Sequence, residues 1–338
     1  MNADFHYYAV AVLARAAGFT AEDALTIAYA SQYVDDATES APLRVGEFLF
    51  EPVRSAHQGL RTYSWAVQKK VHIPFHFLPA YPFDPGRVPD PHFETQADSP
   101  FANEVLNKAL RGPLGLYGLC SIGIALHVYA DTWAHQKFSG KKDNVNDVRD
   151  IRLYLDGRWK KPFWQNLYLD LLPRVGHPQA SDYPDIAWLN WRYRHGRPRS
   201  SKLVSRDNPR LFLQSAERIY GHLSNASKTE ISSEVIPWET IEKPFRRILG
   251  SPLAAANACA EWKSEFGGLF GGREYHYDRL RWRAEALGDV RGIRWDKKRP
   301  ASFKRMWFKL KADFFDSAWV QFHRAAQKHR HFVLERLV

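Results

Sequence analysis

Apolar residues recur every three or four positions along most of the chain, which is the spacing of one face of an α-helix. The pattern predicts helices over about 5–17, 20–34, 54–71, 101–110, 114–138, 209–223, 239–249, 253–265, 274–285 and 302–337. No segment alternates apolar and polar residues clearly enough to predict a strand, and no repeat is visible. The sequence therefore predicts an all-α fold, a multi-helix bundle with long irregular loops.

Two irregular stretches interrupt the helical pattern. The first is IPFHFLPAYPFDPGRVPDPHF, and the second, over about 176–208, contains HPQASDYPD and RYRHGRPRSS. No shift in composition separates two domains clearly, and the weakest joint lies near Ser200. We therefore expect a helical core over 1–200 and a helical extension over 201–338 with a basic C-terminal helix, or one continuous domain.

Composition and charge narrow the class of protein. The net charge is +11, and residues 291–338 hold 13 Lys/Arg against 4 Asp/Glu. Such a patch attracts nucleic acid, anionic lipid or a phosphorylated substrate, or is simply a solvated helix face. The longest apolar stretch, Pro113 to Leu126, is too short to cross a bilayer, and no signal peptide is visible. We expect a cytoplasmic protein without a transmembrane segment.

The segment IALHVYADTWAHQKF places three metal-ligand residue types at regular spacing. His127, Asp131 and His135 lie at i, i+4 and i+8, which advances by about 40° per step, so they share one helix face. His and Asp are usual ligands of zinc and related divalent ions. The alternative is a salt-bridged His/Asp row inside a core. Cys120 and Cys259 are the only cysteines, which excludes a cysteine-rich site.

Further His and Asp residues lie where predicted helices begin or end. Taken singly, these residues have simpler interpretations, as an N-cap, a solvated helix end or a core histidine. Together they supply enough nitrogen and oxygen ligands for more than one ion. They are Asp4 and His6 at the first helix, Asp35 and Asp36 at the end of the second, His76 in IPFHF, and His177, Asp182 and Asp185 in GHPQASDYPD.

The order of these residues resembles the superfamily of zinc-dependent phospholipases C and fungal single-strand zinc nucleases. The central helix matches the branch that shares LHxxxDxxxH, present here from Leu126 to His135. The opening DFHYYAVAVLARAAGF, followed by IAYASQYVDDAT, also resembles an uncharacterised bacterial family. The superfamily motifs cover roughly residues 4–185.

This resemblance implies an all-helical fold with two or three zinc ions, or another divalent metal. His6 would lie by one ion, Asp35, His76, His127 and Asp131 around another, and His135, His177 and an acidic residue at a third. Asp131 would bridge two ions, and a metal-bound hydroxide would attack phosphorus in line.

The chain departs from the superfamily pattern at two ligands. Secreted members use the amino group of a processed N-terminal residue, and no cleavable signal is visible here. We therefore expect Asp4 to replace that ligand, with an N-cap as its alternative role. The acid that follows the last histidine by four residues is also missing, because position 181 is Ser. Asp182 or Asp185 must replace it, and Asp185 is favoured.

Three functions remain open from the sequence. The first is a phospholipase C-like phosphodiester hydrolase, and the second is a nuclease acting on single-stranded nucleic acid. The aromatic loops YPFDPG and IAWLNWRY suit a lipid cleft or stacked bases equally. The third is a non-catalytic, metal-stabilised module that binds a partner. An open coordination position facing a cleft would favour an enzyme.

Overall fold

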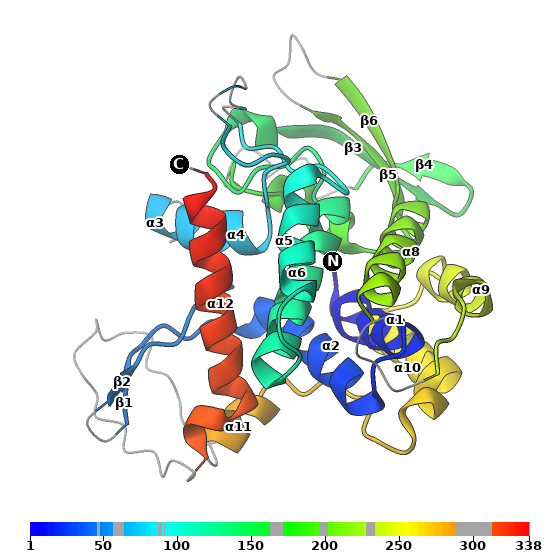
Figure 1. The fold of residues 1–338 in the computed structure, drawn as a ribbon. Coiled ribbons are helices and arrows are strands. Elements are labelled where there is room, and N and C mark those ends of the chain that lie inside the picture. Colours follow the sequence, from blue (N-terminus) through cyan, green and yellow to red (C-terminus); the bar gives the residue numbers. More distant parts are fainter. Residues whose placement is uncertain are drawn as a thin grey trace.

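A long buried helix, α6 (Leu116–Ala134), runs through the middle of the computed structural model (Figure 1). Its main neighbours among the described residues are the helices α2 (Ala21–Asp36), α5 (Pro100–Leu110), α8 (Asn208–Ser227) and α12 (Ala318–Glu335). Nearly every residue of α6 from position 118 onward is buried, as expected for a helix that is apolar on all sides. The ligand-type residues of this helix therefore lie inside the molecule.

The structure describes residues 1–45, 48–56, 64–84, 86, 90, 92–162, 172, 174–195, 202–227, 234–287 and 313–337. The predicted domain joint near residue 200 and the basic segment 291–312 lie outside these residues. The large hydrophobic cluster draws side chains from both sides of position 200, among them Phe5, Leu126, Phe212 and Trp319.

The N-terminal segment forms two helices that pack on each other, and the second of them packs against α6. The first begins as a π-helical turn, η1 (Asp4–Ala9), and continues as α1 (Val10–Ala16). Thr20 caps the N-terminus of α2, because its Oγ1 accepts a hydrogen bond from the backbone N–H of Asp23 at 3.1 Å. Helix α2 approaches α6 closely at Gly123, where a Cβ atom would lie only 2.3 Å from the carbonyl oxygen of Ile27.

The helical segment before His76 begins later than predicted. It consists of α3 (Trp65–Val67), a π-helical part η3 (Gln68–His72) and α4 (Ile73–Phe75). Residues 54–56, predicted as helix, have no regular structure, and 57–63 lie outside the described residues. The other described α-helices are α9 (Trp238–Leu249), α10 (Ala255–Phe266) and α11 (Arg281–Leu287). Short 3-10 turns lie at η4 (Asn144–Asn146), η6 (Pro178–Ala180), η7 (Tyr183–Asp185), η8 (Gly267–Phe270) and η9 (Phe314–Asp316).

The prediction of an all-α fold is wrong, because the chain also forms an antiparallel sheet and is a mixed α/β protein in which helices dominate. The sheet has the order β4-β3-β5-β6, with β3 (Val148–Leu155), β4 (Arg158–Lys160), β5 (Asn190–His195) and β6 (Lys202–Asp207). A second, two-stranded sheet joins β1 (Leu43–Val45) and β2 (Phe48–Phe50). An irregularity between Arg149 and Arg152 breaks the alternation that would have predicted β3.

A buried arginine fastens the sheet to the C-terminal end of α6. Nη2 of Arg206, on β6, donates to the carbonyl oxygens of Trp133 and Ala134, each at 2.8 Å. These carbonyls lack partners within the helix, so the guanidinium caps it. The inner face of the sheet covers a second hydrophobic cluster that includes Phe77 and Phe138. The sheet thereby fixes the helix end that carries His135.

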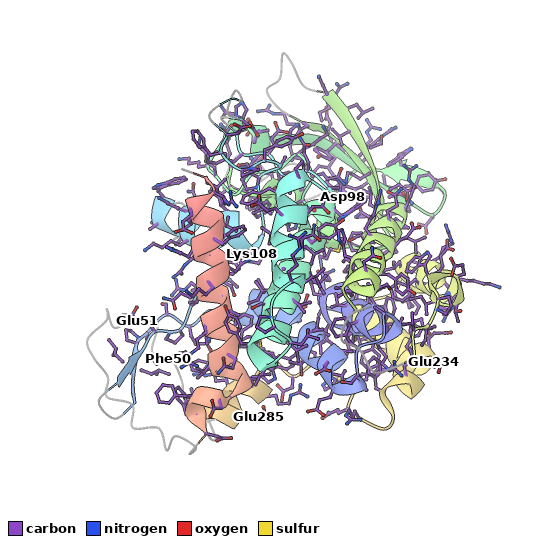
Figure 2. The ribbon with its side chains drawn as sticks, in the orientation of Figure 1. Phe50, Glu51, Asp98, Lys108, Glu234 and Glu285 are labelled. Atoms are coloured by element: carbon purple, nitrogen blue, oxygen red, sulfur yellow. The ribbon has the colours of Figure 1, made fainter. Side chains whose placement is uncertain are left out.

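Two side chains near the ends of α5 link this helix to α12 and to α6. Nζ of Lys108, on α5, lies 3.7 Å from the ring centroid of Phe332 on α12 (Figure 2). Asp98, just before α5, accepts a hydrogen bond from the hydroxyl of Tyr129 on α6 at 2.7 Å (Figure 2).

Within the described ranges, no helix combines the length and apolar character needed to cross a membrane.

Candidate metal centre

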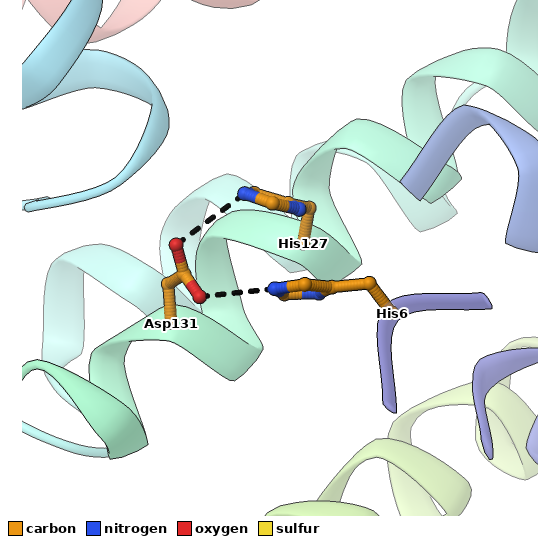
Figure 3. Close-up of side chains that lie close together, drawn as sticks. All are labelled: His6, His127 and Asp131. Carbon is orange, nitrogen blue, oxygen red and sulfur yellow. Dashed lines mark hydrogen bonds and ion pairs between the residues drawn. The ribbon is translucent and has the colours of Figure 1, made fainter. Parts of the chain in front are cut away.

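The carboxylate of Asp131 lies at the centre of a buried group of histidines. Its two oxygens face different rings: Oδ1 lies 3.1 Å from Nε2 of His6, and Oδ2 lies 3.3 Å from Nε2 of His127 (Figure 3). The rings of His6 and His127 stack with their centroids 3.9 Å apart. All three side chains are buried, so η1 and α6 together form one group of possible metal ligands.

A second group joins α2, α4 and α6. Nδ1 of His76 lies 3.3 Å from Nε2 of His127, and Oδ1 of Asp35 lies 3.8 Å from each of these nitrogens. The sequence left Asp35 and Asp36 as alternatives, and only Asp35 belongs to this group. Asp36 instead accepts a hydrogen bond from the hydroxyl of Tyr277 at 2.7 Å.

A third group lies at the C-terminal end of α6. His135 is the C-cap residue of this helix, and its Nε2 lies 2.9 Å from Oδ1 of Asp185. Nε2 of His177 lies 3.3 Å from Oδ2 of the same carboxylate. Asp185 therefore occupies the acidic position that the sequence assigned to it or to Asp182, which is exposed and lies outside the group.

Asp131 connects the three groups. Its Oδ2 lies 3.4 Å from Nδ1 of His76 and 3.6 Å from Nδ1 of His135, in addition to its contacts with His6 and His127. One carboxylate whose two oxygens face separate sets of ligands has the arrangement expected of a bridging ligand between ions.

Backbone carbonyls orient three of the histidine rings. Nε2 of His76 lies 2.8 Å from the carbonyl oxygen of Ser55, and Nδ1 of His177 lies 2.8 Å from that of Ser181. Nδ1 of His135 lies 2.8 Å from the carbonyl oxygen of His76. A neutral imidazole that donates its single N–H to a carbonyl leaves a lone pair on its other nitrogen. In each ring that other nitrogen faces an aspartate of the cluster, which is the usual outer-shell arrangement of metal-binding histidines.

One group at the cluster was not expected from the sequence, the α-amino group of Met1. Its nitrogen lies 2.5 Å from Oδ1 of Asp131 and 3.0 Å from Oδ1 of Asp185. Burial lowers the pKa of this amine, but the carboxylates of Asp131, Asp185 and Asp35 outweigh burial and raise the pKa to about 11. This ammonium lies at the cluster, where the sequence placed no amino group. Its position depends on tertiary packing, and no local sequence signal marks it.

Asp4, the expected replacement for that amine, lies outside the three groups that the described residues form. Oδ1 of Asp4 accepts the backbone N–H of Phe5 at 3.0 Å, and burial raises the pKa of Asp4 to about 6. The N-cap residue of η1 is Ala3 and no side chain caps this end, so the alternative role of Asp4 as an N-cap is wrong. A role as a metal ligand stays a prediction.

The charges in the cluster are strongly coupled. Burial opposes ionisation of Asp131 and Asp185, but the Met1 ammonium and the neighbouring histidines outweigh it and hold both pKa values well below their usual range. Burial, with His127 close by, lowers the pKa of His6 well below 6.5. Asp131 and Asp185 are thus ionised and the His6 ring is neutral, which are the states that bind metal. Burial lowers the pKa of His135, but Asp131 and Asp185 outweigh burial and raise it, so this ring gains a proton more readily.

The chain as a whole matches one family profile, which spans residues 1–337. The chain belongs to DUF6765, a family of unknown function. Searches of curated proteins and of solved structures find no match. The cluster of this DUF6765 member must therefore be interpreted from its own geometry.

One edge of the cluster is accessible in this DUF6765 member. The side chain of Asp35 is 34% exposed, whereas those of His6 and His127 are fully buried. Gln32 lies within hydrogen-bond distance of Asp35 and also lines a groove of about 540 Å³. The groove lies beside the accessible edge and is lined by Ala3, Gln32, Asp36, Glu274, His276, Tyr277, Asp278, Arg279 and Arg281.

Proposed function

We propose that the cluster binds two or three divalent metal ions, zinc being the best match, and that the protein is a metal-dependent phosphodiester hydrolase. One observation carries the proposal: seven ligand-type side chains from several segments converge around the carboxylate of Asp131, which makes a set of eight. They are His6, Asp35, His76, His127, Asp131, His135, His177 and Asp185.

The chemistry of the donors fits divalent ions. Five imidazoles and three carboxylates are a nitrogen and oxygen set of the kind that zinc prefers when cysteine is lacking. Three carboxylates gathered largely away from solvent need a compensating positive charge, and the Met1 ammonium supplies only one. Nδ1 of His6 and Nδ1 of His127 have no hydrogen-bond partner among the described residues, and their Nε2 atoms face Asp131.

Each of the three groups would hold one ion, with Asp131 shared between them. Bound divalent ions would supply Lewis acidity toward a phosphate group and lower the pKa of a water molecule. The chain contributes the positioning: carbonyl-anchored rings hold their lone pairs in place, and the buried rings of His6 and His127 exclude bulk water from one side.

The accessible edge supports catalysis over a purely structural metal site. A structural site is closed by protein ligands, whereas a catalytic site keeps a position open to substrate. Asp35 supplies such an edge. The neighbouring groove is lined by Arg279 and Arg281, which can contact a phosphate group, and also by Asp36, Glu274 and Asp278. A phospholipid headgroup, in a phospholipase C-like reaction, and a nucleic-acid backbone both present the phosphodiester that this site suits.

Metal analysis combined with a diesterase assay tests the proposal. Protein purified without chelators or a His-tag should contain two to three equivalents of metal, lose thermal stability on chelation and hydrolyse bis(p-nitrophenyl) phosphate. Asp131→Asn should lose metal and turnover together. Substoichiometric metal with no effect of chelation on unfolding would rule out the metal site. Full metal content without turnover of the small diester, phosphatidylcholine or an oligonucleotide would favour the non-catalytic module.

A further inference from the structure

The outer face of the four-stranded sheet is basic and faces away from the hydrophobic cluster. Trp191 and Tyr193 on β5 point inward and are fully buried, so the alternate residues Arg192 and Arg194 lie on the outer face. The inner face packs on Phe77 and Phe138, whose rings contact His135 and His177. The outer face is therefore separated from the metal centre by the thickness of the sheet.

Arginines lie directly opposite one another across two strands of this face. Arg149 pairs with Arg194, and Arg152 pairs with Arg192, in the register of β3 and β5. Like charges directly opposite each other destabilise a sheet. Asp150 lies 3.5 Å from Arg194, but within the described residues no carboxylate lies within ion-pair distance of Arg152 or Arg192. An anionic partner would remove this repulsion.

Exposed aromatic rings continue the same face. Tyr154 and Trp159 are cross-strand neighbours on β3 and β4, 44% and 37% exposed, with ring centroids 5.3 Å apart. The guanidinium of Arg192 lies 4.3 Å from the ring centroid of Trp159. The face thus combines a row of flat side chains in contact with one another and two arginines, Arg152 and Arg192, without an ion-pair partner among the described residues.

The acids near this face are already engaged. Asp156 pairs with Lys160 at 2.5 Å, and Asp207 accepts the backbone N–H of Arg210 at the start of α8. Among the described residues of the four strands, the other acid is Asp150, which lies 3.5 Å from Arg194. The arginine row therefore keeps a net positive charge toward solvent.

We propose that this sheet face binds single-stranded nucleic acid. Its arginines would contact backbone phosphates, and bases would stack on Trp159, Tyr154 and the Arg192 guanidinium, as on other sheet surfaces that bind single strands. A lipid surface would use the charge but not the exposed rings of Tyr154 and Trp159, and a duplex keeps its bases stacked inside. The binding goes beyond the proposed hydrolase activity and requires no metal.

Fluorescence anisotropy with a labelled oligothymidylate of twenty nucleotides tests the proposal on the full chain. Arg152→Gln/Arg192→Gln should weaken binding at least tenfold and reduce the slope of log affinity against log salt by about 1.4, the release expected for two phosphate contacts. Trp159→Ala should weaken binding about tenfold, and Trp159→Phe should restore most of it. Metal removal and Asp131→Asn should leave the affinity unchanged.

The matched control is Arg218→Gln/Arg246→Gln, which removes the same charge from exposed arginines on α8 and α9. It should bind like the unmodified chain, and circular dichroism should be the same for all variants. An equal loss in the control, or equal binding of a duplex with no effect of Trp159→Ala, would overturn the proposal. Binding to phosphatidylserine vesicles but not to the oligonucleotide would overturn it in favour of a membrane surface.

Discussion

Nδ1 of His76 lies 3.3 Å from Nε2 of His127, although 51 residues separate the two in the sequence. Because Nε2 of His76 lies 2.8 Å from the carbonyl oxygen of Ser55, its N–H points there and its Nδ1 keeps a lone pair. Two ring nitrogens facing each other at this distance need a positive charge or a proton between them, and Asp35 lies beside both.

His76→Gln and His127→Gln should therefore each remove about one equivalent of metal and lower the thermal stability of the metal-loaded protein. Elemental analysis and thermal unfolding with and without chelator measure both effects. His222→Gln, a half-buried histidine on α8 that belongs to none of the ligand groups, serves as control. Equal metal content in all three variants would contradict the assignment.

Asp185 and Asp182 offer a matched pair three residues apart. Asp185→Asn removes a negative charge from the group of His135 and His177, so it should lower the metal stoichiometry and the diesterase rate by at least tenfold. Asp182→Asn changes an exposed residue outside the group and should match the unmodified chain in both measurements. A reversed order would show that the wrong carboxylate has been assigned.

The close packing of α2 on α6 should be sensitive to a single methyl group. Gly123→Ala would place a Cβ 2.3 Å from the backbone oxygen of Ile27, so the helices must separate, at a cost of about 1–3 kcal/mol in unfolding free energy. The shift would also move Asp35 on α2 relative to His127 on α6. Gly221→Ala on α8, where nothing lies within 4 Å, should instead stabilise the protein by about 0.5–1 kcal/mol. Urea unfolding and metal content compare the two.

The free energy of unfolding should decrease as the pH is lowered, because of His323, a buried residue of α12. Nδ1 of His323 accepts the backbone N–H of Val53 at 3.1 Å, and burial lowers the pKa of His323 to about 3. In the unfolded chain the pKa is near the ordinary value of 6.5, so only the unfolded state takes up the proton between these limits. The contribution is complete above about pH 6.5 and is lost at about 1.4 kcal/mol per pH unit as the pH falls toward 3.

Urea unfolding between pH 5 and 7.5 measures this slope, and His323→Gln should reduce it by about one proton. His331→Gln, at an exposed position two turns along the same helix, should leave the slope unchanged. An unchanged slope in His323→Gln would show that other groups cause the pH dependence.

The arginine pair on the sheet should cost stability in the free protein. Arg152 lies opposite Arg192, so Arg152→Gln should raise the free energy of unfolding by about 0.2–1 kcal/mol at low salt, and the gain should shrink as salt screens the repulsion. Thermal unfolding at two salt concentrations measures it. If Arg152→Gln instead lowered the free energy of unfolding at low salt, the two arginines would not repel each other in the folded protein.

The sequence by itself determined the features that depend on local periodicity. Helix spacing alone places His127 and Asp131 on one face of α6, and the structure has both side chains at the cluster. The cap of α2 at Thr20 and the buried character of α6 follow equally from neighbouring residues. These features are visible in the sequence because a helix sets side-chain direction within a few positions.

Tertiary structure decided which distant groups reach the cluster. Asp35 and Asp36 are adjacent in sequence, and the packing of α2 on α6 turns only Asp35 toward His127. The Met1 amine reaches Asp131 across 130 residues, and Arg206 holds the helix end beside His135 from a strand that the sequence pattern did not predict. Such contacts depend on how whole elements pack, because the chemistry of a charged or polar residue does not specify which distant partner will neutralise it.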